Sequence, residues 1–397
     1  MKPTGEALLP DVPAVGDLSY TAWARIRSCL LKAAYSYDAF TNWLDRGSVY
    51  SAVGSARHKL VELVADGRSA GLPAPSFDWV RTRFDALLSD ERALLTEQWH
   101  PAEVPPIRSW PDVALTRGRL ARDLGTIDGV QWPATDPAPT RAVHGAPPAH
   151  LANLAPPLPG PGESAIEVTL RDGERHLLGR LDRLENRSGV AVVVDLKAGI
   201  GTSADELASM HRRQMLFYAG LVQANFGVWP ELELSPAVGG RVQVTYTSND
   251  VYEVRTAAVA DRAALNAAIA AGGLPASTQA SIEKCSWCAY QVVCPALADQ
   301  WSGLMTAHAE RPMRAVSLAV GEVQEVRRHH SSTDVLIRQQ DHRTAPAGDV
   351  VVTRLPGDLE VAVGIDIAIS RVSPAGSDRV LRAEWDSIIW QGPVEGA

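Results

Sequence analysis

Two stretches decide the fold expected for this chain: Gly179-Arg180-Leu181-Asp182-Arg183 and, shortly after it, Ala191-Val192-Val193-Val194-Asp195-Leu196-Lys197. The second is an apolar strand that ends in a carboxylate and, two residues later, a lysine. Because side chains alternate along a strand, Asp195 and Lys197 point to the same side. Asp182 comes from the preceding strand, and two carboxylates on neighbouring strands can hold a hard divalent cation through oxygen. The two stretches therefore predict a cation site with an ammonium group beside it.

Periodicity and turn residues predict the elements around these stretches. Three consecutive strands are expected at 163–169, 176–185 and 190–197, joined by hairpin turns at Asp172-Gly173 and at 186–189. Helices are expected at 19–40, 49–65, 77–100, 204–226 and 261–271, with Cys29 on the first and His58 on the second. A fourth strand is expected at 241–247. This order predicts an α/β layer arrangement.

Composition divides the rest of the chain. Residues 1–17 are expected to form an N-terminal tail, and the proline-rich residues 101–162 an irregular excursion over the surface. Residues 309–397 are expected to form a small all-β barrel or sandwich, with an oligonucleotide-binding (OB-like) barrel as one alternative. Its short strands are expected at 313–320, 322–328, 333–338, 349–355, 359–370 and 379–385, with turns at Pro356-Gly357 and 374–376.

Length and charge limit the classes of protein. At 397 residues the chain exceeds a single compact core, so two domains or one domain with an appendage are expected. The net charge of −8 is unfavourable for binding a polyanion such as a nucleic acid, although binding requires only a local basic groove. Only five of the 38 Lys and Arg residues are lysines, which makes Lys197 notable. With no apolar signal segment and no run of about 18 apolar residues, a cytoplasmic location without membrane contact is predicted.

The four cysteines form a split pattern. Three lie in a C-x2-C-x5-C array, Cys285, Cys288 and Cys294, and the fourth is Cys29. In a cytosolic chain, clustered thiolates are more often metal ligands than disulfides. One four-thiolate site is predicted, holding an iron-sulfur cluster or zinc. In the alternative, Cys29 is a buried apolar thiol and the other three bind zinc with a histidine such as His211 or His308.

Taken in order, several motifs resemble those of a known family. They are Gly54-x3-His58, the two stretches quoted above with Ala198-Gly199 after the second, and Gln214-x3-Tyr218. Together with the split cysteines they resemble the RecB-like branch of the PD-(D/E)xK nucleases, in particular the iron-sulfur nuclease domains of AddB and of CRISPR-associated RecB-like exonucleases. The resemblance covers about 18–298. It implies a restriction-endonuclease-like core over 18–300, a mixed central sheet flanked by helices, with a 4Fe-4S cluster as a clasp.

The resemblance also implies site residues. His58, Asp182 and Asp195, joined by the carbonyl of Leu196, would bind Mg²⁺ or Mn²⁺, and the oxygen-rich set suits these ions. Lys197 would orient or deprotonate the attacking water. Gln214 and Tyr218 share one helix face and would position the lysine or the DNA backbone. Phosphate contacts are assigned to four arginines: Arg180, Arg183, Arg212 and Arg213.

Each assignment has a structural alternative. His58 could be a structural helix histidine, Asp182 a salt-bridge partner of a neighbouring arginine, and Lys197 a solvated surface lysine. Gln214 and Tyr218 could form an ordinary polar helix face. Glu167 could add a further acidic group, although a surface strand position is the commoner role for such a residue.

Two function classes remain. The first is a Mg²⁺- or Mn²⁺-dependent deoxyribonuclease, a single-strand or DNA-end exonuclease in recombination and repair or in anti-phage defence. The second is a catalytically inactive nuclease-like domain that binds DNA or serves as a structural subunit of a helicase-nuclease or defence complex. The intact Asp182, Asp195 and Lys197 favour the first. Because the sequence has no phosphate-binding loop of the ATPase type, a helicase or ATPase would have to be a separate partner subunit.

Overall fold

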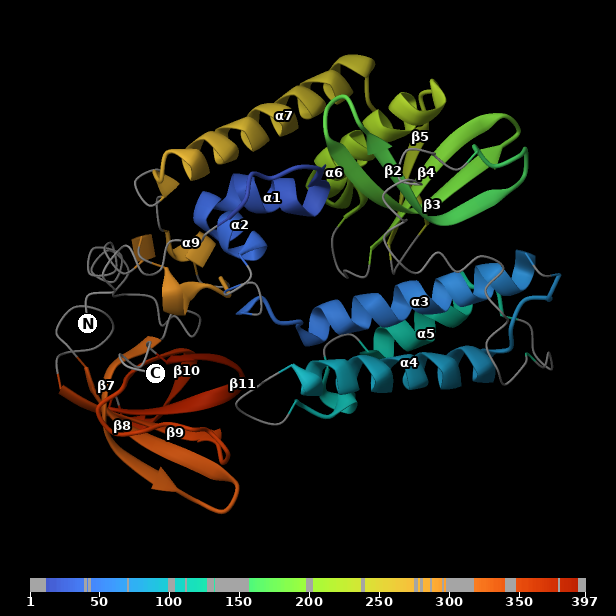
Figure 1. Cartoon of the computed structure of the whole chain (residues 1–397). Coiled ribbons are helices and arrows are strands. Elements are labelled where there is room, and N and C mark those ends of the chain that lie inside the picture. Colours follow the sequence, from blue (N-terminus) through green and yellow to red (C-terminus); the bar gives the residue numbers. More distant parts are fainter. Residues whose placement is uncertain are drawn as a thin grey trace.

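The computed structural model describes residues 12–38, 41, 44–69, 71–98, 104–110, 113–126, 132, 157–197, 203–236, 240–274, 278, 281–285, 288–294, 296–297, 318–339, 348–377 and 379–391. Within these residues lie three hydrophobic cores. One joins the central sheet to its helices, one holds a helical layer together, and one fills a barrel. Figure 1 shows the sheet and its helices above, the helical layer below and the barrel at the lower left.

The central sheet is mixed, as expected. Its six strands are β1 (Leu18–Ser19), β2 (Ser164–Asp172), β3 (Leu177–Arg187), β4 (Val190–Lys197), β5 (Glu231–Pro236) and β6 (Val242–Gln243). The order is β1-β3-β4-β5-β6, with β2 paired to β3. Strands β2, β3 and β4 form an antiparallel meander, and β5 runs parallel to β4. The predicted strand at 241–247 is reduced to β6, whereas β5 was not predicted.

Both predicted hairpins are present. At the β3–β4 turn, Ser188 and Gly189 have φ values of 53° and 94°, the left-handed pair that matches the twist of a two-residue hairpin. The Asn186 side chain fixes this turn, because its Oδ1 accepts a hydrogen bond from the Gly189 N–H at 2.8 Å. At the β2–β3 turn, Asp172 Oδ1 accepts from the Arg175 N–H at 3.2 Å. The β2–β3 turn sets the register in which the strands bearing Glu167 and Asp182 face each other.

Four helices complete the α/β part: α1 (Tyr20–Ser28), α2 (Leu30–Tyr37), α6 (Ala204–Phe226) and α7 (Ser248–Ala270). Helix α6 has the bounds predicted for it, begins with a capping box of Ser203 and Glu206, and ends at Gly227 with a φ of 70°. It packs on the sheet through the large core that also holds Leu181 and Val193. Helix α7 begins at Ser248, thirteen residues before the predicted start, behind a capping box formed by Thr247 and Asp250.

The prediction of one helix over 19–40 is wrong at its centre. Cys29 has extended backbone angles, φ −166° and ψ 125°, and separates α1 from α2. It ends the first helix and caps the second, since its Sγ accepts a hydrogen bond from the Lys32 N–H at 3.5 Å. Cys29 therefore lies at a helix junction rather than within a helix.

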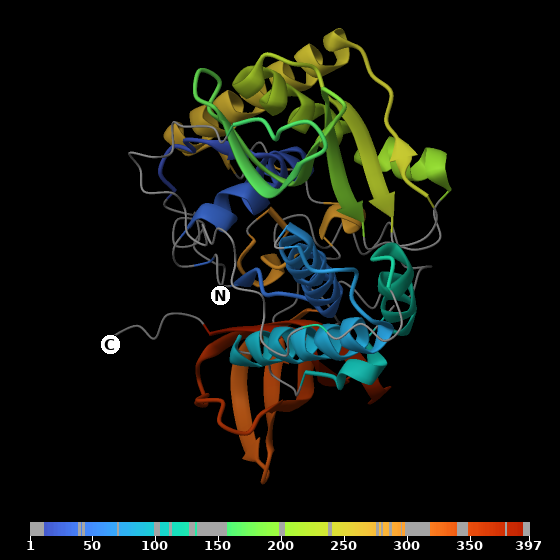
Figure 2. The ribbon, with the colours of Figure 1, turned by 90° about the vertical axis from the view of Figure 1, so that its right-hand side faces the viewer.

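A helical layer lies below the sheet in Figures 1 and 2. It consists of α3 (Val49–Ser69), α4 (Phe77–Glu97) and α5 (Val113–Asp123), packed around a core that includes Leu60, Phe84 and Leu120. Leu196, near the end of β4, packs against this core and so brings the helical layer to the strand ends.

Helix α5 corrects part of the prediction for 101–162. Val113, Thr116, Leu120 and Leu124 recur at helical spacing and are buried, so this segment is part of a core rather than an irregular excursion. Trp132 is also buried and its indole N–H donates to the Pro73 carbonyl at 2.9 Å. The arginines and prolines around these positions mask the apolar pattern in the sequence. Residues 133–156 lie outside the described part.

The C-terminal strands form a closed barrel in the order β10-β11-β9-β8-β7. Their bounds are β7 (Leu318–Arg328), β8 (Ser332–Gln339), β9 (Gly348–Pro356), β10 (Asp366–Ser377) and β11 (Val380–Gln391). The strands predicted at 313–320 and 322–328 are one strand, in which Gly321 allows close approach of the Arg338 carbonyl; residues 313–317 are not described. The turn predicted at 374–376 lies inside β10, where the pairing with β11 changes register.

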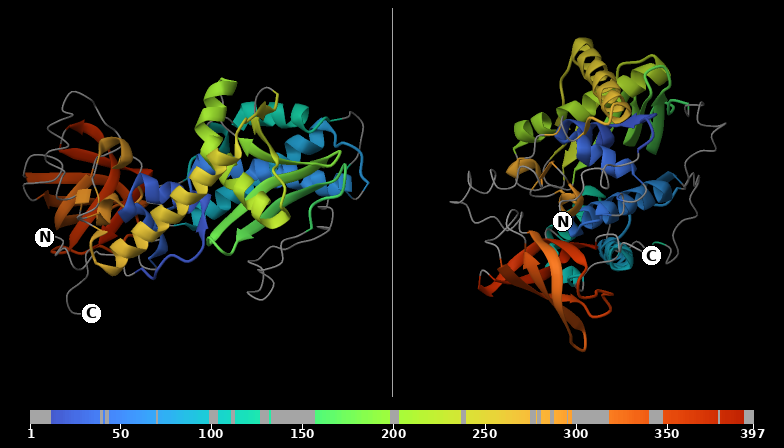
Figure 3. Two further views of the ribbon diagram at one scale, coloured as in Figure 1. Left: turned by 90° about the horizontal axis from the view of Figure 1, so that it is seen from above. Right: turned by 60° about the vertical axis from the view of Figure 1, so that its left-hand side comes forward.

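The barrel packs against the cysteine-bearing segment. The short 3-10 helix η3 (Gln291–Val293) contacts β10 and β11, and Ile388 of β11 belongs to the large core of the α/β part. Arg46 Nη1 donates to the Ser387 carbonyl at 3.4 Å. Figure 3 (left) shows the barrel at one end of the molecule, beside this segment. Separately, none of the described helices has the length and apolarity needed to cross a bilayer.

Candidate metal centre

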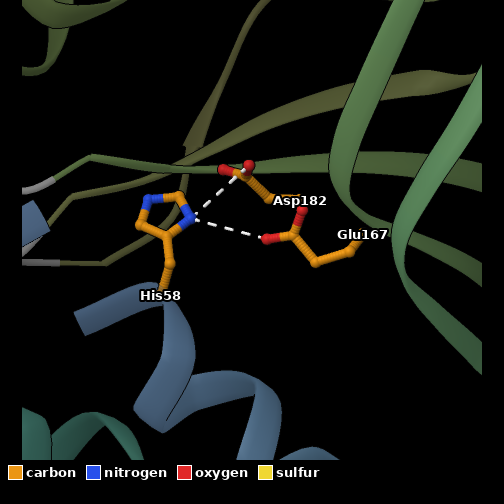
Figure 4. Close-up of side chains that lie close together, drawn as sticks. All are labelled: His58, Glu167 and Asp182. Carbon is orange, nitrogen blue, oxygen red and sulfur yellow. Dashed lines mark ion pairs between the residues drawn. The ribbon is translucent and has the colours of Figure 1, made fainter. Parts of the chain in front are cut away.

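Three side chains from three different elements converge where the helical layer meets the sheet (Figure 4). His58 projects from α3, Glu167 from β2 and Asp182 from β3. His58 Nδ1 lies 3.6 Å from Asp182 Oδ1 and 3.8 Å from Glu167 Oε1. Among the described residues, these form the one group of three or more His, Cys, Asp or Glu side chains whose ligand atoms all lie within 4.8 Å of one another. We call this group the acidic trio.

The register of the hairpin explains why two carboxylates meet. Ile166 pairs with Arg183 and Val168 with Leu181, so Glu167 and Asp182 occupy opposite positions between them. Like charges directly opposite each other destabilise a sheet. Glu167 also has a φ of 53°, a left-handed value that is costly for a non-glycine residue within a strand. The surrounding structure must offset both costs, and such costs cluster at functional sites.

Each carboxylate has one oxygen held by a donor and the other directed at His58. Asp182 Oδ2 accepts a hydrogen bond from the Leu196 N–H at 2.6 Å, and Oδ1 faces the imidazole. Glu167 Oε2 is in ion-pair contact with Arg180 Nε, and Oε1 faces the imidazole. Such supporting contacts fix the orientation of metal ligands. The free oxygens and the imidazole nitrogen form a donor set that suits Mg²⁺ or Mn²⁺.

The electrostatics of the trio also favour a cation. Burial lowers the pKa of His58, but the neighbouring Glu167 and Asp182 outweigh this effect and raise the pKa above its ordinary value. Burial raises the pKa of Asp182, while the charge of His58 and the hydrogen bond from Leu196 oppose the rise. The crowded carboxylates thus stabilise positive charge at this position, whether it is a proton on His58 or a bound ion.

Asp195 belongs to a second group of contacts, one strand further along the sheet. Its Oδ2 lies 2.5 Å from Lys197 Nζ, and its Oδ1 accepts a hydrogen bond from Gln214 Nε2 at 3.0 Å. Gln214 Oε1 accepts from Lys197 Nζ at 2.8 Å, and Gln214 Nε2 also donates to Tyr218 Oη at 3.1 Å. We call these four side chains the lysine network. Gln214 and Tyr218 therefore hold the lysine and the carboxylate in place.

The predicted ligand set is thus divided between two neighbouring groups. Asp182 lies in the acidic trio, and Asp195 pairs with Lys197 instead of joining the trio. Asp195 is 2% exposed, and burial raises its pKa, with the charge of Lys197 opposing and that of Asp182 adding to the rise. Its Oδ2 is buried and contacts the Lys197 ammonium, so a cation bound at Asp195 would have to share this oxygen with Lys197. The role of the Leu196 carbonyl stays a prediction.

The four arginines assigned to phosphate contacts all have partners within the chain. Arg180 contacts Glu167, Arg183 lies 3.3 Å from Glu185, and Arg212 lies 3.1 Å from Asp250. The Arg213 guanidinium lies 5.8 Å from the centre of the Trp23 ring. Arg180 orients a member of the trio, so the structure gives it a positioning role that the sequence did not suggest.

The cysteines lie on two segments that pack together through tyrosines. Tyr35 of α2 donates to the Val293 carbonyl at 3.0 Å and stacks on Tyr290 with ring centres 5.3 Å apart. Burial raises the pKa of Cys288 to about 11 and raises that of Cys294 strongly. The thiols of Cys29, Cys285 and Cys288 raise the pKa of Cys294 further, so the four groups interact electrostatically.

The arrangement differs from a compact zinc site. Zinc at about 2.3 Å from each sulfur would hold thiolates roughly 3.8 Å apart, yet no three of these described thiols gather within 4.8 Å. His211, the proposed histidine partner, instead interacts with Lys197 and Gln214, and burial lowers its pKa to about 4. His308, the other histidine of that alternative, lies outside the described residues.

Sequence reasoning offered Glu167 as an additional acidic group but favoured a surface strand role, and the structure places it in the trio. The signal was present in the hairpin, since counting back from the Asp172-Gly173 turn sets Glu167 opposite Asp182. The helix positions of His58, Gln214 and Tyr218 and the strand positions of Asp182, Asp195 and Lys197 are those predicted. Ala198 and Gly199, which follow them in the motif, lie outside the described residues.

A comparison with protein-family models matches residues 17–295 to the PD-(D/E)XK nuclease superfamily. A search of curated proteins finds no match. The match covers most of the chain and includes both the acidic trio and the lysine network. The chain therefore belongs to the PD-(D/E)XK nuclease superfamily.

Proposed function

From membership in this superfamily, we propose that the protein is a Mg²⁺- or Mn²⁺-dependent deoxyribonuclease of the RecB-like iron-sulfur branch, acting as an exonuclease on single strands or DNA ends. The observation that carries the proposal is the convergence of His58, Glu167 and Asp182 beside the buried Asp195–Lys197 pair. We assign the nuclease domain to 18–300 and the barrel to 309–397, where it would dock a strand or a partner.

The proposed roles follow from the contacts of each side chain. His58, Asp182 and Asp195 hold the divalent cation, with Glu167 as an additional carboxylate. When bound, the cation supplies Lewis acidity toward the scissile phosphate and lowers the pKa of water. Arg180 keeps Glu167 in orientation.

Lys197 is the proposed group that handles the attacking water. Its ammonium contacts Asp195 and donates to Gln214, and its side chain is 16% exposed, so it has little freedom to leave the site. A fixed ammonium can orient the nucleophile and offset charge that develops on the phosphate oxygens in the transition state. Gln214 and Tyr218 act through Lys197 and Asp195 as positioning residues.

We further propose that Cys29, Cys285, Cys288 and Cys294 bind a 4Fe-4S cluster. The mutual influence of the four thiols supports one shared site. Backbone N–H groups also donate to two of the sulfurs, to Cys29 from Lys32 at 3.5 Å and to Cys294 from Leu297 at 3.4 Å, contacts that are typical of cluster thiolates. The cluster would join the α1–α2 junction to the segment under the barrel.

The test uses anaerobically purified full-length protein and labelled single-stranded DNA with either end blocked. We expect Mn²⁺-dependent release of nucleotides, stopped by EDTA and reduced at least about 100-fold by Lys197→Gln. The matched control is Lys59→Gln, which changes a lysine on the same helix as His58 that pairs with Glu91 at 2.7 Å. DNA binding without any cleavage would favour an inactive subunit of a helicase-nuclease or defence complex instead.

A further inference from the structure

Helix α3 carries a row of three residues that leads away from the acidic trio. Tyr50, Gly54 and His58 are spaced by four, so they follow one another along one ridge of the helix. A different face of α3, with Val53, Leu60 and other apolar residues, is buried in the core shared with α4 and α5. The row therefore lies on the side of α3 that the helical layer leaves open.

At the middle of this row, the surface of α3 is open to solvent because Gly54 has no side chain. A Cβ built at Gly54 would meet nothing within 4 Å. Glycine in a helix interior costs about 1 kcal/mol relative to alanine, and no residue of the described part of the chain comes close enough to exclude a side chain at this position. Gly54 instead leaves room above the helix, directly next to His58 in the row.

The far end of the row is an exposed aromatic ring. The side chain of Tyr50 is 68% exposed, one of the two highest values among the large hydrophobic residues described. An exposed ring that leads to a metal centre is a suitable platform for a base, because aromatic rings stack on unpaired bases without regard to sequence. The eight residues from Tyr50 to His58 rise about 12 Å along the helix. That distance equals about three to four stacked nucleotides at about 3.4 Å each.

We propose that Tyr50 stacks on an unpaired base of a single-stranded nucleic acid, about three to four nucleotides from the bond held at the acidic trio. Gly54 leaves space for the sugar-phosphate backbone that joins the two positions. The inference rests on the proposed nuclease function, because His58 marks where the scissile phosphate binds. It adds a site for the strand that does not depend on the four arginines.

The chain offers a matched control for Tyr50. Tyr252 is also 68% exposed but lies on α7. Figure 1 shows α7 along the top of the molecule and α3 in the layer below. A general effect of removing an exposed tyrosine would appear in both variants, whereas a stacking site beside the trio affects Tyr50 alone.

The experiment measures binding without cleavage, in EDTA, by the fluorescence anisotropy of a labelled single-stranded oligonucleotide. Tyr50→Ala should weaken binding about 5- to 150-fold, the equivalent of 1–3 kcal/mol for one stacked base. Tyr50→Trp should restore binding, and Tyr252→Ala should leave it unchanged. Gly54→Ala should raise the melting temperature and still weaken binding, because the helix gains propensity while the strand loses space.

A second readout identifies the base. Single abasic nucleotides are placed along the oligonucleotide in turn, and one position should weaken binding to the wild type by the same factor as Tyr50→Ala. At that position the two changes should not add. Equal binding by the Tyr50→Ala and Tyr252→Ala proteins, or full additivity at every abasic position, would overturn the proposal.

The outcome is separable from that of the proposed function. If the protein shows no Mn²⁺-dependent cleavage but binding still depends on Tyr50, the nuclease proposal fails and the stacking site stands. If cleavage occurs and binding ignores Tyr50, the stacking site alone is wrong.

Discussion

Gly179 is the position where a single methyl group should disturb both the fold and the candidate site. A Cβ there would collide with Leu221 Cδ1 and lie 3.2 Å from Tyr218 Cε1. Leu221 is 1% exposed and Tyr218 is 8% exposed, so neither ring nor methyl can move into solvent. Overpacking of this kind costs about 1–3 kcal/mol. For a domain of this size each kcal/mol lowers the melting temperature by about 2–4 °C, so Gly179→Ala should lower it by roughly 2–12 °C.

The same substitution should reduce nuclease activity. Tyr218 Oη accepts a hydrogen bond from Gln214 Nε2, and Gln214 holds both Asp195 and Lys197. A displaced Tyr218 therefore shifts the lysine network. Because misplacing a catalytic group by about 1 Å costs up to about 100-fold in rate, we expect kcat/KM to fall about 10- to 100-fold at a temperature where the variant is fully folded.

The assay combines thermal unfolding followed by circular dichroism with Mn²⁺-dependent cleavage. Gly173→Ala is the control, since a Cβ in that β2–β3 turn would meet nothing within 4 Å, and its melting temperature should stay within about 1 °C of the wild type. A rescue variant makes the test specific. Leu221→Ala removes the atom that collides, so the double variant should be more stable than the sum of the two single effects by about 1 kcal/mol or more. If Gly179→Ala matches Gly173→Ala in stability, or if the two effects simply add, the packing of β3 on α6 is not as described.

Three further predictions test separate parts of the account. Gln214→Ala should lower kcat/KM more than 10-fold and lower the free energy of unfolding in urea titrations by about 2–4 kcal/mol. The reason is that the Gln214 amide forms hydrogen bonds with two charged groups, Lys197 and Asp195, and a third with Tyr218. A fall in activity without any loss of stability would contradict the lysine network. Cys29→Ser should abolish the visible absorption of the anaerobically purified protein and lower its melting temperature by about 8 °C or more. This value takes ~4 kcal/mol for loss of the cluster and ~2 °C per kcal/mol. A colourless wild type, or a variant of unchanged melting temperature, would show that no cluster joins the two cysteine-bearing segments. Burial raises the pKa of Asp195 to about 6, so between about pH 4 and pH 6 the metal-free folded state keeps a proton that the unfolded chain releases. The free energy of unfolding should therefore fall as the pH rises through this range. Asp195→Asn should reduce this fall in urea titrations with EDTA at pH 4 and pH 7, and an identical fall in both proteins would show that Asp195 ionises normally.

The elements that were predicted correctly carry their signals within a short stretch of sequence. The β2–β3–β4 meander has turn residues at the right spacing, including Asn186 and Gly189. Helix α6 begins at Ser203 with its partner Glu206 three residues later and ends at Gly227. In such cases the side chains that stop or start an element are its chain neighbours, so no knowledge of the remaining fold is needed.

The elements that were missed depend on contacts from distant parts of the chain. Strand β1 has two residues and exists because Leu18 pairs with Leu177. Strand β5 is stabilised by parallel pairing with β4, which places Leu234 beside Asp195. Strand β1 is too short to show a pattern. The residues Glu231-Leu232-Glu233-Leu234 of β5 do alternate, but over only four positions, and parallel pairing leaves no turn signal between the partners.

The site was predicted in composition but not in detail. The motif spacing identified His58, Asp182, Asp195 and Lys197, yet it could not show which carboxylate pairs with the lysine. That outcome depends on the length of the Lys197 side chain and on Gln214, which faces it from α6. Glu167 required the hairpin register, and its contact with Arg180 required the rotamers of both side chains.

The central claim is that phosphodiester hydrolysis takes place at a divalent cation held by the acidic trio beside the lysine network. Its most direct test is the rate of Mn²⁺-dependent cleavage of end-labelled single-stranded DNA by the wild-type protein and by Asp182→Asn, which keeps the size of a side chain that both His58 and the Leu196 N–H contact. The account predicts cleavage by the wild type that depends on Mn²⁺, and a loss of at least about 100-fold in the variant. Cleavage at the wild-type rate by Asp182→Asn would contradict it.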